Sequence, residues 1–435
     1  MKKVYISLVA EFIHPRDLKI IEKANDLGEL TVGLLSDKAI SSLRSPPALD
    51  YPQRKKVLEN IKGVSRIVIQ KTLDPEENLR SLKPDYIIHS DEWSEWGGKK
   101  VRDLIQKVLG EWGGTLIEIP LGKESPSNQV LGELRAKGTT PQLRLSSLKR
   151  LIESKPIVRI IEVHNGLCGL IAEKVQIIKE DQVKEFDGMW ESSLTDSTSK
   201  GRPDNSSVDM TSRIQTIDQI LDVTTKPIIV DGDNGGMIEH FRFAVRTLER
   251  LGVSAVIIED KVGPKRNSLF GTDVQQCQDS MEEFSEKIKA GKASQVTEDF
   301  MIIARIESLI LKKGQNDALS RAESYMEAGA DGIMIHSKEE SPEEILTFCR
   351  RFKELKKRVP LIVVPSTYSI ISEKELTQAG VQVVIYANHL LRSAFPAMVN
   401  VARSILEEGR CHEASRHYCM PIGDILNLVP APVVS

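Results

Sequence analysis

Cysteine is scarce in this sequence of 435 residues, and its scarcity already excludes two classes of small fold. There are five cysteines, an odd count, and no two of them form a Cys-x-x-Cys pair. The sequence therefore indicates neither a disulfide framework nor a zinc knuckle. A reducing cytoplasm is the simplest compartment for such a chain, and we expect the protein there.

An excess of charge of one sign is also missing. The 59 basic and 62 acidic residues leave a formal net charge of −3. This balance argues against nucleic acid and a membrane surface as partners, because binders of both carry a basic excess. Local groups of cations can still bind a small anionic substrate. No apolar run approaches the roughly 18 residues of a membrane span, so we expect a soluble protein.

The chain is too long for one ordinary core, and two domains are expected. In residues 1–135, short apolar runs alternate with helical patterns, as in a parallel sheet with crossover helices. The runs are VYISLVAEF, LTVGLLS, RIVIQ, YIIHS and TLIEIP. We predict a Rossmann-like α/β domain here. The polar segment AKGTTPQ at 136–142 then predicts a short linker.

Residues 143–435 contain eight further apolar runs that end in polar residues. They are PIVRIIEVH, GMWESS, PIIVDGD, SAVIIED, FMIIARIES, GIMIHS, PLIVVP and VQVVIYANH. Helical patterns lie between them, often closed by Gly, a usual helix stop. Eight β/α units in series predict a (β/α)₈ barrel, followed by C-terminal helices. The active site of such a barrel lies where its strands end.

The predicted strand ends carry groups that could hold a metal ion and an anion. They are Trp190 and Ser192, Asp231 and Asp233, Glu259 and Asp260, Arg305 and Glu307, His336, and Asn388. Asp231 and Asp233 could cap the next helix. With Glu259 at the end of the neighbouring strand, however, three carboxylates converge, and hard cations such as Mg²⁺ prefer such oxygen ligands.

Arg305 and His336 end consecutive strands of the predicted barrel. A planar guanidinium at a strand end suits a phosphate or a carboxylate. A structural salt bridge to Glu307 is the alternative for Arg305, and a packing role is the alternative for His336. Together, the two side chains predict an anion site.

The stretch IIEDKVGPKRNSLFG, residues 257–271, places many charges in one loop beyond Glu259. A charge run of this kind is usually a solvated turn. Its position over the mouth of a barrel instead predicts a lid, which closes on a negatively charged substrate and excludes water.

The segment EDKVGPKRNS resembles the E-D-K-x-x-P-K-x-N-S loop of phosphoenolpyruvate mutase, a member of the isocitrate lyase and phosphoenolpyruvate mutase superfamily. The resemblance covers roughly residues 143–410. Other segments continue it in order, namely EVHNGLCGLI, MWESSL, DGDNGG, ARIES, AGADGIMIHSK, VPSTY and YANHLLR. It implies an intramolecular phosphoryl transfer that converts phosphoenolpyruvate to phosphonopyruvate, the first step of phosphonate biosynthesis.

The resemblance also implies roles for individual residues. Mg²⁺ would be held by Asp231, Asp233 and Glu259, directly or through water. The implied catalytic residues are Asp204, Lys265, Asn267, Arg305 and His336, and the implied substrate-binding residues are Trp190, Ser192, Leu194, Lys261 and Ser268. Mutase barrels typically form tetramers with an exchanged helix, so a homo-oligomer, tetramer or dimer, is implied as well.

Two relatives of the mutases catalyse other reactions. Isocitrate and methylisocitrate lyases carry a K-K-C-G-H segment with a catalytic cysteine, whereas this chain has Lys261 followed by Val, Gly and Pro. Phosphonopyruvate hydrolase shares most of the site but tends to have Thr where this chain has Asn267. The loop thus favours a mutase, and the hydrolase stays the alternative.

The first domain resembles cytidylyltransferase-like nucleotidyltransferases over about residues 1–135. The similar segments are SLVAEFIHPRDLKIIEKANDLGELTVGLLSDKAI, YPQRKKVLENIKGVSRIVIQ and KPDYIIHSDEW. Those enzymes use an H-x-G-H signature to bind nucleotide phosphates. Here His14 and Arg16 are the candidate nucleotide-binding residues, but Asp17 replaces the second histidine, and 122–131 only loosely resembles the second signature. We favour a degenerate domain, with a bifunctional mutase and cytidylyltransferase as the alternative.

Overall fold

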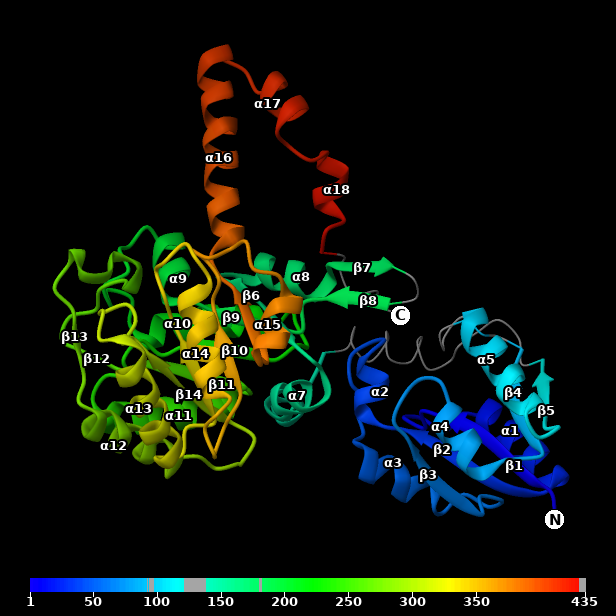
Figure 1. Ribbon diagram of the computed structural model, residues 1–435. Helices are drawn as coiled ribbons and strands as arrows, with labels where there is room; N and C mark the ends of the chain where they lie inside the picture. Colours follow the sequence, from blue (N-terminus) through cyan, green and yellow to red (C-terminus); the bar gives the residue numbers. More distant parts are fainter. Residues whose placement is uncertain (92, 94–97, 121–137, 180–181, 430–435) are drawn as a thin grey trace.

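The computed structural model describes residues 1–91, 93, 98–120, 138–179 and 182–429 (Figure 1). Five parallel strands form a sheet in the first part of the chain, in the order β3-β2-β1-β4-β5. They are β1 (Lys3–Leu8), β2 (Glu29–Leu35), β3 (Arg66–Gln70), β4 (Tyr86–Ser90) and β5 (Thr115–Ile119). The helices are α1 (Pro15–Leu27), α2 (Asp37–Ser41), α3 (Tyr51–Leu58), α4 (Glu76–Leu82) and α5 (Gly98–Gly110). All five predicted strands are confirmed, and the fold is Rossmann-like.

The second part of the chain contains a closed barrel of eight parallel strands, which follow one another around the barrel in chain order. They are β6 (Val158–Val163), β9 (Gly188–Glu191), β10 (Ile228–Asp231), β11 (Ala255–Glu259), β14 (Met301–Ile306), β15 (Gly332–Ile335), β16 (Leu361–Val363) and β17 (Val383–Tyr386). Each lies in one of the eight predicted runs, so the (β/α)₈ barrel is confirmed. The carboxyl ends of all eight strands therefore meet at one rim.

Helices surround the barrel and close its amino-terminal side. They are α7 (Pro141–Ser154), α8 (Gly166–Lys174), α9 (Ser193–Ser199), α10 (Met210–Leu221), α11 (Ile238–Leu251), α12 (Met281–Lys292), α13 (Gly314–Glu327), α14 (Glu343–Phe352) and α15 (Glu373–Ala379). The predicted glycine stops hold for α11 and α15, which end at Gly252 and Gly380 with φ of 85° and 92°, whereas α13 ends at Glu327, two residues before Gly329. An L side chain is disfavoured in that left-handed region.

Helix α7 begins inside the segment that the sequence predicts as a linker. Pro141 is its first residue, and the hydroxyl of Thr140 accepts a hydrogen bond from the backbone of Leu143. A proline suits the first helical position, where no N–H has a helical partner. The predicted linker 136–142 thus already contributes the start of the barrel's first helix, while 136 and 137 lie outside the described residues.

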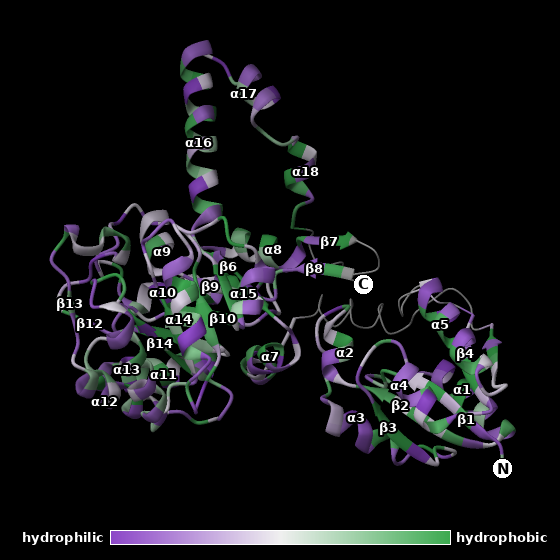
Figure 2. Ribbon diagram, in the orientation of Figure 1, coloured by the Kyte–Doolittle hydropathy of each residue, from purple (hydrophilic) through white to green (hydrophobic). Residues whose placement is uncertain are grey.

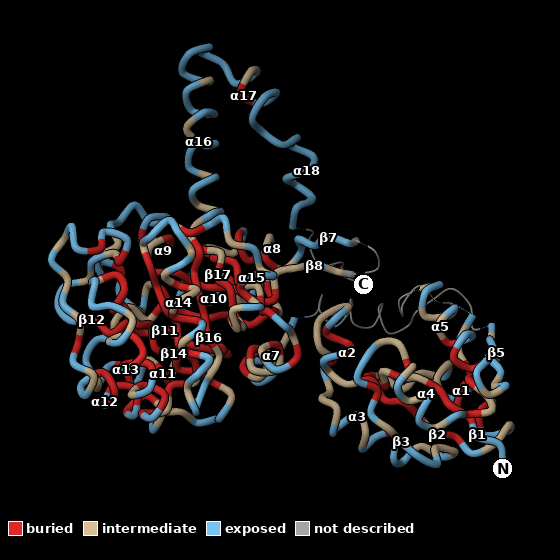
Figure 3. The backbone as a smooth tube through the Cα atoms, in the orientation of Figure 1, coloured by how far each residue is buried: buried red, intermediate tan, exposed pale blue. Residues whose placement is uncertain are grey.

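Apolar side chains fill two layers of the barrel. The layer inside the barrel includes Ile160, Ile257, Ile303, Met334 and Ile385, which are all buried. A larger layer joins the outer face of the strands to the helices, and the barrel strands are accordingly buried except at Arg159 of β6 and Tyr386 of β17, which are half-buried (Figure 3). The polar side chains that do occur in this interior are concentrated at the strand ends, where they form the site described below.

The two parts of the chain touch through a loop of the first domain. Arg150 of α7 donates a hydrogen bond to the carbonyl of Ala48 at 2.7 Å and also contacts the carbonyl of Pro47. The Ser45 hydroxyl donates to Glu185 at 2.7 Å. Glu185 ends the hairpin of β7 (Gln176–Lys179) and β8 (Gln182–Glu185), which lies at the same edge of the barrel.

Three helices follow the barrel. Helix α16 (His389–Glu408) projects away from the barrel. Helices α17 (His412–His417) and α18 (Ile422–Leu426) then lead back toward the barrel (Figure 1). Apolar residues recur along α16 and α18 (Figure 2), yet α16 has no buried residue. Among the placed residues, no helix has both the length and the apolar character to cross a bilayer.

Candidate active site

A small cavity of about 50 Å³ lies at the carboxyl ends of the barrel strands. Eleven of the predicted site residues line it, namely Trp190, Ser192, Leu194, Asp204, Asp231, Glu259, Lys265, Asn267, Ser268, Arg305 and His336. The other two from the barrel, Asp233 and Lys261, line an adjoining hollow together with Glu259 and Lys265. The structure thus brings together every barrel residue to which the resemblance assigns a role, whereas Asp260 and Glu307 at the predicted strand ends line neither hollow.

The charged loop lies closed over this cavity. It leaves the barrel through β12 (Lys261–Val262) and returns through β13 (Cys277–Gln278), which pair antiparallel. The ammonium of Lys265 pairs with Asp204 at 2.7 Å and also contacts Asp233 and Ser193. The amide of Asn267 donates to Asp204 at 2.9 Å. Lys265 is thereby buried, so the loop has the position that a lid requires.

Lys261 and Ser268 connect the loop to the barrel. Lys261 donates to the carbonyl of Arg266 and to the hydroxyl of Ser268, both at 2.9 Å. Ser268 also accepts a hydrogen bond of 2.6 Å from Arg305. Both residues were proposed to bind substrate. In this closed conformation, the Lys261 ammonium holds the loop, and Ser268 joins the loop to the anion site.

Asp231 and Asp233 follow β10. Asp231 accepts hydrogen bonds from the Ser193 hydroxyl at 2.9 Å and from the backbone N–H of Asp233 at 3.1 Å. Burial opposes ionisation of Asp231, but Lys265, Arg213 and Arg305 outweigh it and lower its pKa to about 2. Neither aspartate caps the next helix, because α11 starts after Met237. The capping alternative is therefore wrong.

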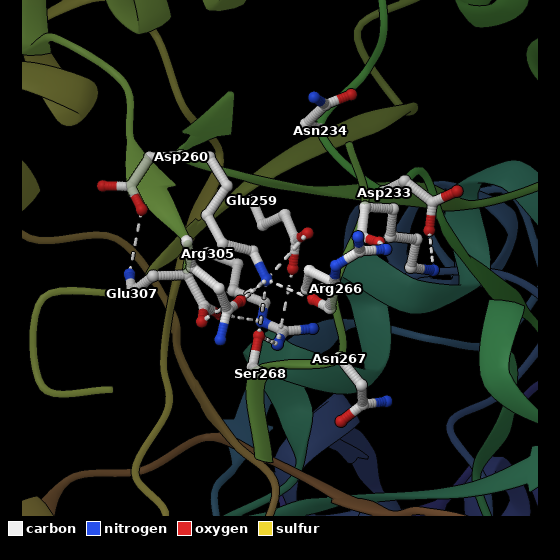
Figure 4. A network of polar contacts seen from close by, with 12 residues as sticks. Asp233, Asn234, Glu259, Asp260, Arg266, Asn267, Ser268, Arg305 and Glu307 are labelled. Atoms are coloured by element: carbon white, nitrogen blue, oxygen red, sulfur yellow. Dashed lines mark hydrogen bonds and ion pairs between the residues drawn. The ribbon is translucent and has the colours of Figure 1, made fainter. Parts of the chain in front are cut away.

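Glu259 ends β11 at the edge of the same cavity. It lies 3.2 Å from the Lys261 ammonium and 3.5 Å from the Arg305 guanidinium. Burial raises its pKa to about 7, although Arg305 and Lys261 both act in the opposite direction. Figure 4 shows Glu259 and Arg305 pointing toward each other, with Asp233 beyond them and Asn267 on the loop.

The carboxylates of Asp231, Asp233 and Glu259 are ligand types that suit Mg²⁺, although they do not converge on one point in this structure. Within the described residues, no three His, Cys, Asp or Glu side chains form a group that could hold a metal ion. Instead, the Lys265 ammonium lies between Asp204 and Asp233. The donor set is nevertheless one of carboxylate oxygens with Asp231 ionised, which is what a hard cation prefers. The proposed ligands stay a prediction.

Arg305 and His336 are directly hydrogen-bonded. Arg305 pairs with Glu307, so the salt bridge considered for it exists, and it still lines the cavity. Its Nη2 donates to Nδ1 of His336 at 2.9 Å. Because a guanidinium only donates, His336 must accept at Nδ1 and carry its proton on Nε2. Burial and Arg305 lower the pKa of His336, which keeps the ring neutral with one N–H to offer.

The remaining lining residues come from β9 and α9. The indole Nε1 of Trp190 is buried and has no hydrogen-bond partner among the residues described. Ser192 precedes α9 at its capping position, but its hydroxyl makes no cap hydrogen bond. These two groups are therefore available to a ligand in the cavity.

Several residues of the site escaped the sequence analysis. Ser193 binds Asp231 and Lys265, and its place beside Ser192 was the one available signal. Arg213 on α10 is buried against Glu191 and lies 3.8 Å from Asp233. No local pattern points to Arg213, because its partners lie on other elements of the barrel.

The candidate nucleotide residues of the first domain lie at the start of α1. His14 is the N-cap residue, and its backbone N–H donates to the Asp17 carboxylate at 2.8 Å. Glu11, just after β1, is buried and accepts from Arg44 and from the backbone of Ala48. Two carboxylates thus lie where a nucleotide phosphate would need positive charge. The segment 122–131, proposed as a second signature, lies outside the described residues.

The sequence model of phosphoenolpyruvate phosphomutase matches residues 148–406, more than half of the chain. The chain belongs to the phosphoenolpyruvate phosphomutase family. A cytidylyltransferase-like model matches residues 10–109, which confirms the resemblance of the first domain.

Both a mutase and a hydrolase are among the proteins that this chain resembles. Phosphoenolpyruvate phosphomutase of Tetrahymena pyriformis is 38% identical over 61% of this chain and 84% of its own length. Phosphonopyruvate hydrolase of Variovorax sp. is 35% identical over 61% of this chain and 88% of its own.

Similar solved structures also include a phosphomutase and a phosphonopyruvate hydrolase. The phosphomutase of Streptomyces platensis subsp. rosaceus is 37% identical, with a TM-score of 0.59 over 65% of this chain and 93% of its own. A phosphonopyruvate hydrolase complex with oxalate and Mg²⁺ is 31% identical, with a TM-score of 0.58 over 67% of this chain and 95% of its own.

Proposed function

We propose that the barrel catalyses the Mg²⁺-dependent interconversion of phosphoenolpyruvate and phosphonopyruvate. In this isomerisation, the bond between phosphorus and the enol oxygen breaks, and a bond forms between phosphorus and the methylene carbon of the same molecule. No atom enters or leaves. The transition state of phosphoryl transfer is loose, so catalysis requires positioning and charge rather than a strong nucleophile.

Arg305 and His336 are the groups proposed to hold the phosphoryl group. Arg305 is a permanent cation, and the Nε2–H of a neutral His336 can donate to a phosphoryl oxygen without a proton transfer. The mutual hydrogen bond of the two side chains fixes their orientation. Such preorganised donors stabilise charge that develops in the transition state.

The opposite side of the cavity is proposed to bind the carboxylate and the enolate oxygen. Ser192 and the start of α9 with Leu194 lie there, next to Asp231. When bound, Mg²⁺ would supply positive charge to these substrate oxygens, held by Asp231, Asp233 and Glu259. The Mg²⁺ in the hydrolase complex belongs to that protein, and its fold similarity to this barrel supports the assignment.

Exclusion of water decides between a mutase and a hydrolase. A water molecule that reaches the phosphoryl group would give pyruvate and phosphate instead of the isomer. The observation that favours the mutase is Asn267, which lies on the closed loop and donates to Asp204 over the cavity. The sequence identities do not separate the two reactions, because they are 38%, 35% and 34% to three mutases and 35% to a hydrolase.

The test is a phosphorus NMR assay with phosphonopyruvate and Mg²⁺. A mutase forms phosphoenolpyruvate, whereas a hydrolase releases inorganic phosphate. We expect the phosphoenolpyruvate signal to grow and the phosphate signal to stay small. Phosphate as the main product would contradict the proposed mutase activity and support the alternative, a phosphonopyruvate hydrolase.

We also propose that the chain forms a homo-oligomer through its C-terminal helices. Phe395, Met398 and Leu406 of α16 and Ile422 and Leu426 of α18 are exposed apolar residues. A helix whose apolar residues are all accessible gains stability when a second copy covers them. Light scattering should give a mass of a dimer or a tetramer, and Phe395→Glu with Met398→Glu should lower it.

A further inference from the structure

Asp260 follows Glu259 directly but turns away from the cavity (Figure 4). It is completely buried. One carboxylate oxygen accepts the backbone N–H of Glu307 at 2.9 Å, and the other accepts the side-chain amide of Gln278 at 2.8 Å. Glu307 follows β14, and Gln278 belongs to β13. One buried carboxylate therefore connects the rim of the barrel to the strand through which the loop returns.

Helix α13 reaches the same carboxylate from outside the barrel. Arg321 and Tyr325 donate to Asp260 at 3.1 and 2.8 Å. Arg321 further donates to the carbonyl of Asp279 at 2.9 Å and to Asp317 at 3.0 Å. Asp279 directly follows β13, so Arg321 holds both the carboxylate and the backbone at the loop's exit.

These contacts close the base of the loop. The strands β12 and β13 pair through Lys261 with Gln278 and Val262 with Cys277, which leaves residues 263–276 as the loop itself. The backbone N–H of Asp279 donates to the carbonyl of Asp260 at 2.9 Å. A two-residue hairpin has little stability of its own, so its geometry depends on what holds its ends.

We propose that Asp260, Gln278, Arg321 and Tyr325 are positioning residues that hold the loop 263–276 in its closed position. We call these four residues the hinge cluster. They touch no part of the cavity and act through the loop, because its entry and exit determine where Lys265 and Asn267 lie. The catalytic consequence rests on the proposed function, whereas the effect on the loop's position does not.

The electrostatics of the cluster support a fixed arrangement. The guanidinium of Arg321 lies 3.1 Å from the Asp260 carboxylate and offsets part of the cost of its burial. A buried carboxylate is tolerated when its lone pairs are satisfied by donors in good geometry. Asp260 has four such donors from three separate segments, and a displacement of the loop's exit would break the hydrogen bond from Gln278 to Asp260 together with that from Arg321 to the Asp279 carbonyl.

The experiment measures opening of the loop by cleavage with trypsin. The loop contains two trypsin sites, Lys265, whose side chain is 8% exposed, and Arg266, which is exposed. Tyr325→Phe removes one hydroxyl from the cluster, and Gln278→Met removes the amide at the loop's exit. Tyr386→Phe is the matched control. Tyr386 lies on β17 and also donates a 2.8 Å hydrogen bond to a carboxylate, that of Glu373.

We expect both cluster variants to be cleaved in the loop at least about fivefold faster than the wild-type protein, because local opening becomes more frequent. Tyr386→Phe should be cleaved at the wild-type rate. Mass spectrometry of the fragments identifies cleavage after Lys265 or Arg266, and circular dichroism confirms that each variant is folded. Equal cleavage of the wild-type protein and both folded cluster variants would overturn the proposal.

A second readout links the loop to catalysis. In the phosphorus NMR assay with phosphonopyruvate and Mg²⁺, we expect the cluster variants to release a larger share of phosphate and to lose kcat more than they raise KM. A wild-type protein without mutase activity would contradict the proposed function and leave the trypsin result valid. Faster cleavage with an unchanged product ratio and an unchanged kcat would contradict the positioning role in catalysis.

Discussion

The two domains present polar residues at the carboxyl ends of their parallel strands, but they use them differently. At the barrel rim, Lys265 and Arg305 face Asp231 and Glu259 across a cavity. At the sheet edge of the first domain, the buried Arg54 donates to the carbonyls of Leu35 and Leu49 and to Asp37. In the barrel, the charged side chains line a cavity. In the first domain, the buried Arg54 instead binds backbone carbonyls and Asp37 and thereby holds the loops of that domain together.

This difference teaches that the fold of a domain does not establish its activity. Each domain matches a family model, and each has a parallel sheet, open in the first domain and closed into a barrel in the second. A site also requires groups that remain available to a ligand. Each of the predictions below tests one side of the comparison.

The largest effect is expected at Asp231. Asp231→Asn removes an ionised carboxylate from the proposed metal site while keeping its size, and we expect turnover with Mg²⁺ to fall at least about a thousandfold. Initial rates at saturating Mg²⁺ measure the loss. Asp209→Asn is the matched control, because Asp209 caps α10 on the surface of the same barrel. Nearly normal turnover in a folded Asp231→Asn protein would contradict the metal assignment.

A smaller effect is expected on the loop. Asn267→Ala removes the hydrogen bond to Asp204, and we expect turnover to fall about tenfold or more, since a contact of roughly 1.4 kcal/mol to the transition state is lost. The control is Asn205→Ala, at an exposed position beside Asp204. Unchanged kinetics for Asn267→Ala would favour the alternative interpretation, in which the charged loop is a solvated turn.

Asn267 also sharpens the comparison between mutase and hydrolase. Asn267→Thr introduces the residue type that the hydrolases tend to carry, in a loop that is otherwise unchanged. We expect the share of phosphate among the products to increase, which phosphorus NMR measures directly. A product ratio equal to that of the wild-type protein would show that water exclusion depends on other residues of the loop.

The sequence allowed most of this architecture to be predicted. Each barrel strand is a short apolar run that ends in polar residues, so the strand count and the positions of Asp231, Glu259 and Arg305 follow from local patterns. The partners of these residues do not. Arg213 approaches Asp233 from α10, and Arg321 approaches Asp260 from α13. Such pairs depend on helix packing around the barrel, which no local periodicity encodes.

An effect on stability alone is expected in the first domain. Arg54 is fully buried, and Arg54→Met would leave Asp37 and several carbonyls without their donor. We expect the free energy of unfolding of this domain to fall by about 3 kcal/mol, measured by urea denaturation. Turnover of the barrel should not change. A loss of turnover in the folded variant would show that the two domains are coupled.

Substitutions at the start of α1 are expected to have no effect on barrel turnover. They test whether the first domain, unlike the barrel, lacks a functional site. His14→Ala and Arg16→Ala should leave turnover unchanged, and calorimetry with CTP and Mg²⁺ should show no binding heat in the wild-type protein. The reason is the charge around this helix start, where Asp17 already accepts the N–H of His14 and Glu11 is buried nearby. A triphosphate at that place would meet the Asp17 carboxylate at the helix N-terminus, and the nearby cation Arg44 is already paired with Glu11 at 2.8 Å. A titration with Mg²⁺ alone is the control. Micromolar CTP binding that disappears in His14→Ala would make the first domain a second functional site.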